Sequence, residues 1–373
     1  MADAGQVAGA TGSGRPDEIQ VHFLSPGEQT GQQVAAMLVD FISAAQRTLD
    51  LAVYDFRLSE TLSQPIVAAL RERAAAGVAI RIAYDADKPE SPNLIVGQDP
   101  APSGTGAFVQ SLGFPYRRIG GMKLMHSKYV VRDADLPSAA VWTGSTNFTD
   151  DAWTLMENNI LTLTSSPLAA AYALDFAQLW AVGHIEGTGN FEPNPAQLWY
   201  RAAPARVQVL FSPGQGETID EDVAGIVASA ERRVRICSML LNSGLLLTTL
   251  RDLLDEGRVP VDGVYDKTQM ESVLLQWQDV PHNHWKIGAL GDIVARARLV
   301  GKLSTPYSPT GPHDFMHDKV LVVDDTVITG SYNFSRSAEF NAENILLIES
   351  PALADAYSAT IDHLIAKYSG GQQ

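Results

Sequence analysis

Along the chain, apolar residues recur either with the period of a helix, about 3.6 residues, or with that of a strand, about two residues. The order of these helical and extended segments is the same in both halves. Each half opens with a short apolar segment that ends in the tripeptide Ser-Pro-Gly. The serine of this tripeptide is Ser25 in the first half and Ser212 in the second. A helix-period segment, a continuously apolar strand and a second helix-period segment follow in each half. The next predicted strand ends in Tyr-Asp, and an Ala-rich helix finishes each half. Since these features recur in the same order, the sequence predicts a tandem repeat.

The alternation of strands with helices predicts the fold class. This order is typical of α/β domains, in which mostly parallel sheets are flanked by helices. Two similar halves are expected to pack about a pseudo-twofold axis, which brings equivalent segments together. Gly, Pro and Asn interrupt the pattern between Gly187 and Pro204, so the boundary is predicted there. The predicted division is a flexible tail at residues 1–20, a first repeat at 21–190, a linker at 191–204 and a second repeat at 205–370.

Composition narrows the class of protein. A chain of 373 residues suits two domains. Its net charge of −16 argues against broad, nonspecific binding of nucleic acid, although a small basic pocket remains compatible with that charge. The one cysteine, Cys237, excludes an internal disulfide and a cysteine-based zinc site, and its apolar neighbours in the sequence predict a buried side chain.

Targeting signals are weak. No apolar run approaches the roughly 20 residues of a membrane span. The first residues have neither a basic start nor an apolar centre, so they do not form an intact signal peptide. We expect a cytoplasmic protein, and a secreted form that has lost its leader stays open as an alternative.

A short polar signature occurs once in each repeat. It consists of His-x-Lys, four further residues and Asp, followed downstream by Gly-Ser-x-Asn. The members are His126, Lys128, Asp133, Ser145 and Asn147 in the first repeat, and His317, Lys319, Asp324, Ser331 and Asn333 in the second. Twelve residues after each serine, a glutamate is followed by asparagine, as Glu157-Asn158 and as Glu343-Asn344.

These residue types fit phosphodiester chemistry. On a strand, His and Lys two positions apart project from the same face. A neutral imidazole can attack phosphorus, and a protonated imidazole can give its proton to a leaving oxygen. Lysines with Ser and Asn donors can stabilise the growing negative charge, so no metal or cofactor is expected. A carboxylate on each imidazole would fix its tautomer, and Glu157 and Glu343 are the candidates. One motif supplies half of such a site, which explains why it occurs twice.

The doubled signature resembles that of the phospholipase D superfamily, and the resemblance extends over roughly residues 20 to 370. It implies that His126 and His317 are the catalytic pair and that His126 is the nucleophile. It also implies that Asp133 and Asp324 support the motif without touching substrate. The phosphate-binding residues implied are Lys128, Lys319, Ser145, Asn147, Ser331 and Asn333.

Three further features are open to two interpretations. His282 and His284 are two residues apart, but a loop pair is favoured over a metal site because no other ligand residues cluster nearby. His313 lies either in the pocket or on a surface loop. The pairs Tyr84-Asp85 and Tyr265-Asp266 end strands on the side where α/β folds place residues that contact ligands.

The substrate is less determined than the reaction. The superfamily that the signature resembles includes phospholipases, transphosphatidylases, phospholipid synthases and nucleases. The segments that flank both motifs are nearly neutral, which favours a phospholipid over a nucleic acid. We therefore expect a phospholipase D-type hydrolase that works as a monomer with transient contact to a membrane surface. A nuclease is the alternative, and a binding scaffold remains if the site is inactive.

Overall fold

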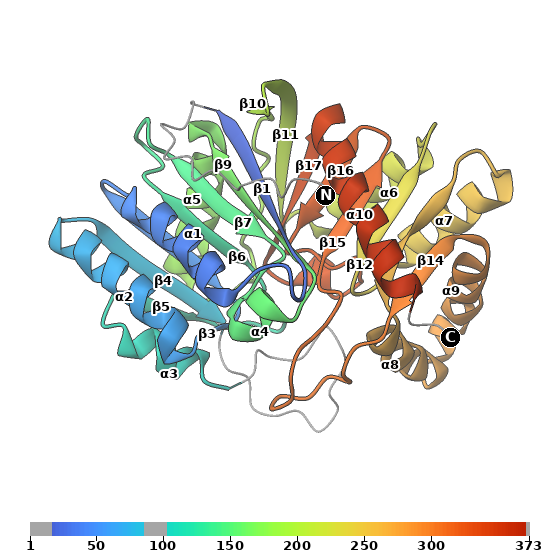
Figure 1. The fold of residues 1–373 in the computed structure, drawn as a ribbon, viewed down its shortest axis with the longest axis horizontal. Helices are drawn as coiled ribbons and strands as arrows, with labels where there is room; N and C mark the ends of the chain where they lie inside the picture. The colour runs from blue at the N-terminus through green and yellow to red at the C-terminus, as the bar shows by residue number, and fades with distance from the viewer. Residues whose placement is uncertain (1–16, 86–102, 371–373) are drawn as a thin grey trace, which may run out of the picture.

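The computed structural model describes residues 17–85 and 103–370 (Figure 1). The elements of the first repeat are β1 (Glu18–Leu24), α1 (Gly31–Ser43), β2 (Thr48–Val53), β3 (Phe56–Arg57), α2 (Glu60–Ala75), β4 (Ala79–Asp85), α3 (Thr105–Ser111), β5 (Tyr116–Ile119), β6 (Lys128–Arg132), β7 (Ala140–Gly144), β8 (Phe148–Thr149), α4 (Asp150–Thr154), β9 (Asn158–Thr164) and α5 (Ser166–Val182). The linking strand is β10 (Ala196–Tyr200).

The second repeat follows the same plan. Its elements are β11 (Ala203–Ser212), α6 (Gly216–Ala228), β12 (Val234–Ser238), α7 (Gly244–Glu256), β13 (Val261–Asp266), α8 (Lys267–Gln278), the 3-10 helix η1 (Pro281–Asn283), α9 (His284–Arg296), β14 (Arg298–Lys302), β15 (Lys319–Val323), β16 (Thr326–Gly330), the 3-10 helix η2 (Ala338–Phe340), β17 (Glu343–Glu349) and α10 (Pro351–Ser369). No helix in the described residues is long and apolar enough to cross a lipid bilayer.

The strand order shows the repeat directly. Among the described residues, the large sheet has the order β14-β13-β12-β15-β16-β17-β11-β10-β1-β9-β7-β6-β2-β4-β5. Read outward from β10, the two halves place equivalent strands at equivalent positions. The two repeats lie side by side in Figure 1, with β1 and α10 near the middle. The predicted pair of α/β repeats related by a pseudo-twofold axis is confirmed.

One detail of the predicted fold is wrong, and two predicted segments contain strands. The sheet is mixed instead of mostly parallel: in its described part, parallel pairing is limited to β2-β4-β5, β12-β13-β14 and the β1-β10 contact. The stretch predicted as a linker, 191–204, contains β10, which pairs with both β1 and β11 and joins the two halves into one sheet. The predicted tail at 1–20 overlaps β1, and its first 16 residues lie outside the described part of the chain.

Buried polar contacts hold the two repeats together in a symmetric way. Nδ2 of Asn344, in the second repeat, donates to Oγ1 of Thr143 in the first at 3.1 Å. In return Oγ1 of Thr329 donates to Oδ1 of Asn159 at 3.3 Å. Apolar packing surrounds these bonds, and the rings of Tyr172 and Phe211 meet edge to face at 5.1 Å across the interface. Because buried polar groups are costly when unpaired, these contacts favour one relative position of the repeats.

Candidate active site

The two histidine segments lie where one repeat meets the other. The backbone N–H of His126 donates to the carbonyl of Ala342 at 2.9 Å, and the N–H of His317 donates to the carbonyl of Glu157 at 3.0 Å. The backbone of each histidine is therefore bonded to the residue that immediately precedes the last strand of the opposite repeat. Both histidines are only 6% exposed, and Nδ1 of each imidazole contacts a residue of the opposite repeat.

The two signature lysines are the cations of this site. Lys128 begins β6 and Lys319 begins β15, and both side chains are almost fully buried. Nζ of Lys128 donates to the carbonyl of His126 at 2.7 Å, and Nζ of Lys319 makes the same contact with His317. Burial lowers the pKa of Lys319 to about 7 and lowers that of Lys128 well below its ordinary value. Two such lysines attract an anion strongly, because a bound negative charge restores their protonated form.

The imidazoles have different partners. Nδ1 of His126 lies 2.7 Å from Oε2 of Glu343, whereas Nδ1 of His317 lies 2.9 Å from Oδ1 of Asn158. Burial lowers the pKa of His126 to about 4, against the opposing effect of Glu343. Burial and the neighbouring lysines lower the pKa of His317 well below its ordinary value. One histidine is thus supported by a carboxylate and the other by a neutral amide.

Glu157 does not hold His317, contrary to the expectation from sequence. The equal spacing of Glu157 and Glu343 from their serines suggested equivalent roles, but the strand register differs by one residue. The backbone N–H of Ser145 donates to the carbonyl of Asn159, and the backbone N–H of Ser331 donates to that of Asn344. Asn159 is therefore the structural counterpart of Asn344, and Asn158 that of Glu343. Because neighbouring residues on an extended chain point to opposite sides, the extra residue turns Glu157 away from the imidazole.

Glu157 instead lies among basic and aromatic groups behind the site. Its Oε1 is contacted by the hydroxyl of Tyr368, by Nζ of Lys367 at 3.4 Å and by Nζ of Lys302 at 3.8 Å. Sequence reasoning therefore missed Asn158. The only available signal was the insertion of one residue between the serine and β9.

The signature serines are less accessible than expected. Ser145 and Ser331 are fully buried, and each accepts a hydrogen bond from the backbone of the following strand at 3.0 Å. The Ser145 hydroxyl donates to Oδ1 of Asn158 at 2.7 Å, and that of Ser331 donates to the carbonyl of Asn344 at 3.4 Å. In this state both hydroxyls are engaged in holding the turn.

The signature asparagines are placed differently. Oδ1 of Asn147 and Oδ1 of Asn333 are buried with no hydrogen-bond partner in the described part of the chain, and both side chains are 5–7% exposed. The side-chain oxygens of Asn147 and Asn333 can therefore each accept a hydrogen bond from a ligand.

The signature aspartates brace the backbone. Oδ1 of Asp133 accepts from the N–H groups of Arg47 and Thr48, at 2.7 and 3.0 Å. Asp324 does the same with Arg232 and Arg233, at 2.8 and 3.0 Å. Both aspartates have a positive φ, 53° and 52°, which is uncommon for residues with a side chain. The hydrogen bonds to the neighbouring backbone stabilise the turn in this conformation.

The aspartates that end β4 and β13 also contact the histidine segments. Asp85 accepts from the N–H of Met125 at 2.8 Å, and Asp266 accepts from the N–H of Met316 at 2.9 Å. Both are buried and reach the residue just before each histidine. Tyr54, which sequence reasoning also missed, packs its ring edge to face with His126 at 4.6 Å and lies 4.9 Å from Nζ of Lys128.

The remaining candidates are resolved by their surroundings. His313 is 9% exposed and its ring stacks between those of Tyr307 and Phe315. His284 begins α9 and its Nε2 contacts the carbonyl of Gln278. Cys237 is buried as expected. No group of residues suited to a metal ion is found within 17–85 and 103–370.

The inequivalence of the two histidines can be tested by adding a charge. In Asn158→Asp, a carboxylate faces Nδ1 of His317, and the pKa of that imidazole should rise by about 1–3 units, as an opposite charge at this distance produces. NMR titration of labelled histidine measures the shift. Glu157→Gln is the control, and a larger shift of His317 in that variant would show that Glu157 is its partner after all.

Comparison with known proteins identifies the family of this chain. The sequence profile of a family described as "Cardiolipin synthase, PLD-like domain" matches residues 38–180 and 224–365, which together are more than half of the chain. A mitochondrial cardiolipin hydrolase from Xenopus laevis is 28% identical over 168 residues, which are 45% of this chain and 70% of that protein. A phospholipase D from Rickettsia prowazekii (strain Madrid E) is 54% identical over 43 residues, 11% of this chain and 21% of that protein. The match thus spans about a fifth of the Rickettsia relative.

Solved structures agree on the fold. A phosphatidylserine synthase from Haemophilus influenzae Rd KW20 has a TM-score of 0.64 at 14% identity and covers 94% of this chain and 86% of its own. A polyphosphate kinase from Porphyromonas gingivalis has a TM-score of 0.56 at 12% identity and covers 92% of this chain and 46% of its own. At such identities the likeness concerns the fold alone. Since the family profile matches once in each repeat, the chain belongs to the phospholipase D superfamily.

Proposed function

We propose that this protein hydrolyses the head-group phosphodiester of a phospholipid through a phosphohistidine intermediate. The observation that carries the proposal is the pair of imidazoles with unlike partners, His126 with Glu343 and His317 with Asn158, beside two buried lysines. The family and its named relatives support a phosphodiesterase or transferase that acts on phospholipid. Hydrolysis, as distinct from transfer, and the covalent intermediate go beyond what the family supports, and we propose them from the surroundings of the two histidines.

The unlike partners favour His126 as the nucleophile. In the first step Nε2 of His126 bonds to phosphorus, the bond from phosphorus to the leaving oxygen breaks, and His317 gives its proton to that oxygen. His126 keeps its proton on Nδ1, so the phosphorylated ring is cationic. The carboxylate of Glu343, 2.7 Å away, offsets this charge, whereas a neutral amide such as Asn158 does not.

The same difference suits His317 to proton transfer. Beside Asn158 and two lysines, its protonated form is poorly stabilised in the empty site, and the negative charge of a bound phosphodiester favours that form. Once bound, the proton is released readily to the leaving oxygen. In the second step neutral His317 takes a proton from water as the water oxygen bonds to phosphorus and the phosphorus–nitrogen bond breaks.

The lysines and asparagines complete the site. Lys128 and Lys319 offset the charge on the non-bridging oxygens, and the side-chain amides of Asn147 and Asn333 can donate to them. Because one chain supplies both motifs, the proposed unit of activity is a monomer. The cardiolipin-related names of the family and of the Xenopus relative, together with the net charge of −16, favour phospholipid over nucleic acid as substrate.

A substrate panel tests the proposed function. Vesicles of cardiolipin and of phosphatidylcholine, single-stranded DNA and bis(p-nitrophenyl) phosphate are assayed with and without EDTA. We expect turnover of phospholipid and of the generic ester, with the ester reaction unaffected by EDTA, since the lysines supply the positive charge. Turnover of DNA alone would identify a nuclease, and loss of ester turnover in EDTA that a divalent ion restores would contradict the proposed chemistry.

Leaving-group dependence tests the assignment of the two histidines. His126→Ala and His317→Ala should each lower turnover by several orders of magnitude on a phospholipid, because both act as one unit. A p-nitrophenyl ester needs little proton donation, so His317→Ala should recover part of its first step and His126→Ala none. Mass spectrometry of the trapped intermediate locates the phosphate. Phosphate found on His317 would reverse the assignment of the two histidines. Equal recovery in both variants would show that their roles are not divided in this way.

Anion affinity should depend on pH through Lys319. Sulfate keeps its charge between pH 6 and 9, whereas Lys319 loses its proton as the pH rises through its folded-state pKa of about 7. The affinity for sulfate, measured by calorimetry, should therefore fall by up to about tenfold per pH unit above 7. Lys319→Met should bind weakly with a shallower pH dependence. Lys286→Met, which removes a buried lysine outside the site, is the control and should keep the wild-type dependence.

A further inference from the structure

The ring of Tyr54 contacts both members of the first His-x-Lys pair. It meets the imidazole of His126 edge to face, with ring centroids 4.6 Å apart, and Nζ of Lys128 lies over it at 4.9 Å from the centroid. The tyrosine is only 8% exposed. One buried aromatic ring is therefore packed against the histidine and the lysine of this repeat at once.

The sheet fixes the place of Tyr54. The residue directly follows β2, which pairs with β6. The backbone N–H of Tyr54 donates to the carbonyl of Ser127 at 3.0 Å, and its side chain packs with Leu124 in a small buried cluster. Because the register of two neighbouring strands determines this position, the fold itself holds the ring beside His126.

The equivalent position of the second repeat carries a different side chain. Met239 directly follows β12, and its backbone N–H donates to the carbonyl of Asp318 at 3.1 Å, as that of Tyr54 donates to Ser127. A flexible thioether side chain therefore stands where the first repeat has an aromatic ring. The two repeats thus differ at this position as well as in the partners of their histidines.

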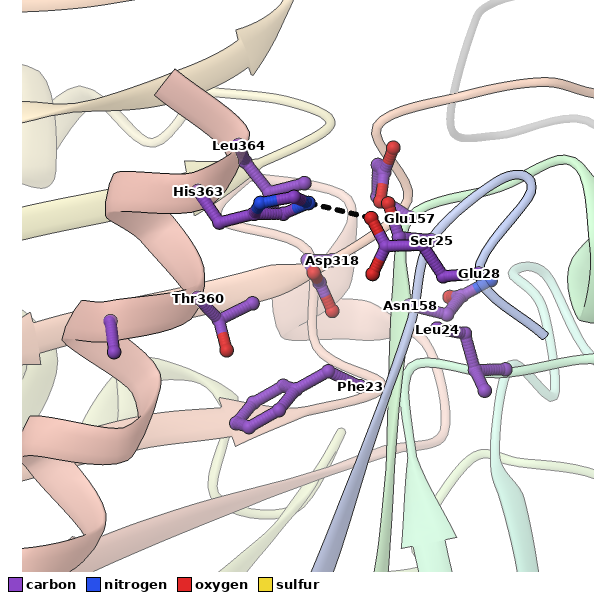
Figure 2. A pocket seen from close by; sticks show the side chains of 11 residues that line it. Phe23, Leu24, Ser25, Glu28, Glu157, Asn158, Asp318, Thr360, His363 and Leu364 are labelled. Atoms are coloured by element: carbon purple, nitrogen blue, oxygen red, sulfur yellow. Dashed lines mark hydrogen bonds and ion pairs between the residues drawn. The ribbon is translucent and has the colours of Figure 1, made fainter. Parts of the chain in front are cut away.

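A cavity adjoins the partner of the second histidine. Asn158, which contacts Nδ1 of His317, lines a cavity of about 320 Å³ behind the site (Figure 2). Tyr54 is not among the residues that line it. The imidazole of His126 is thus packed against a ring, whereas the partner of His317 borders on a cavity.

We propose that Tyr54 is a positioning residue that holds the imidazole of His126 and the ammonium of Lys128 in one fixed arrangement. The contact between Nδ1 and Glu343 fixes one atom of the imidazole, and a ring packed against the imidazole removes its remaining freedom to tilt. The other ring nitrogen, Nε2, then keeps one direction. The role of Tyr54 in turnover rests on the proposed function, whereas its role at Lys128 does not.

An aromatic ring suits a buried ammonium that must receive an anion. The face of such a ring attracts a cation. Lys128 is almost fully buried, and burial lowers its pKa well below the ordinary value, against the opposing effect of nearby carboxylates such as Glu343. The ring of Tyr54 favours the protonated form of Lys128 and adds no negative charge that would repel a bound anion. A further carboxylate at this position would do both.

Sulfate binding at pH 6 tests the contact with Lys128 without turnover. At this pH Lys319, whose pKa is about 7, stays largely protonated, so a change in affinity reports on Lys128. By calorimetry, Tyr54→Leu should weaken binding about three- to thirtyfold, as loss of a cation–π contact implies, and Tyr54→Phe should stay within about twofold of the wild-type chain. Tyr200→Leu is the matched control and should leave the affinity unchanged, because it removes a buried ring in β10 that faces the guanidinium of Arg201.

Fluorinated rings at position 54 test the same contact at nearly constant shape. Tyr54 is replaced by phenylalanines that carry one, two or three ring fluorines. Fluorine withdraws electron density from the ring face, so the affinity for sulfate should fall step by step along the series. Because the shape is kept, the series can be measured even if Tyr54→Leu does not fold. Unchanged affinity in folded Tyr54→Leu, no trend along the series, or equal weakening in Tyr200→Leu would overturn the proposal.

Turnover of bis(p-nitrophenyl) phosphate tests the contact with His126. Tyr54→Leu should lower kcat by about tenfold or more, because an imidazole that tilts is less often in line with phosphorus, and Tyr54→Phe should restore it. The good leaving group should not rescue Tyr54→Leu, since proton donation by His317 is unaffected. An equal loss in Tyr54→Phe would assign the effect to the hydroxyl and overturn the proposal. If the wild-type chain turns over no ester, the proposed function fails, and the sulfate measurements still decide the contact with Lys128.

Discussion

The reciprocal backbone pairing between the repeats is the contact on which the site depends. The N–H of Ala342 donates to the carbonyl of Leu124 and its carbonyl accepts from His126, while Glu157 makes the same two contacts with Phe315 and His317. Backbone bonds of this kind tolerate almost no sliding, since a shift of one residue would reverse the side chains. They therefore determine which side chain meets each imidazole. Neither repeat could complete its own imidazole environment alone.

Burial gives the site its chemical character. Within the described part of the chain, Lys128 and Lys319 form no salt bridge with a carboxylate, and burial lowers the pKa of each. A protein that buries two lysines in this way has an unfavourable empty state, which an anion relieves. In the proposed cleavage of a phosphodiester, preorganised cations and donors of this kind would stabilise the negative charge that grows on the non-bridging oxygens more than they stabilise the ground state. The overall acidic charge of the chain does not prevent this, because the local field at a buried site is determined by its nearest groups.

The two histidines have different surroundings although the two repeats share one fold. The strand order and the buried Asn-Thr contacts repeat closely, yet the register difference before β9 places an amide on one side and a carboxylate on the other. The displaced Glu157 then lines the cavity behind the site. One inserted residue thus gives the two histidines different hydrogen-bond partners, and it also places an acidic residue where the other repeat has Ala342.

The sequence by itself determined the repeat, the α/β class and the residues of the two signatures. These follow from local periodicity and from fixed spacing, which are properties of neighbouring residues. It did not determine the mixed sheet, because strands such as β6 and β15 pair antiparallel with partners remote in the chain. Nor did it determine that Asn158 holds His317, since that depends on strand register across the repeat interface. The residues of each signature can be recognised from neighbouring positions in the sequence. Which atom each imidazole contacts depends instead on contacts between segments more than a hundred residues apart.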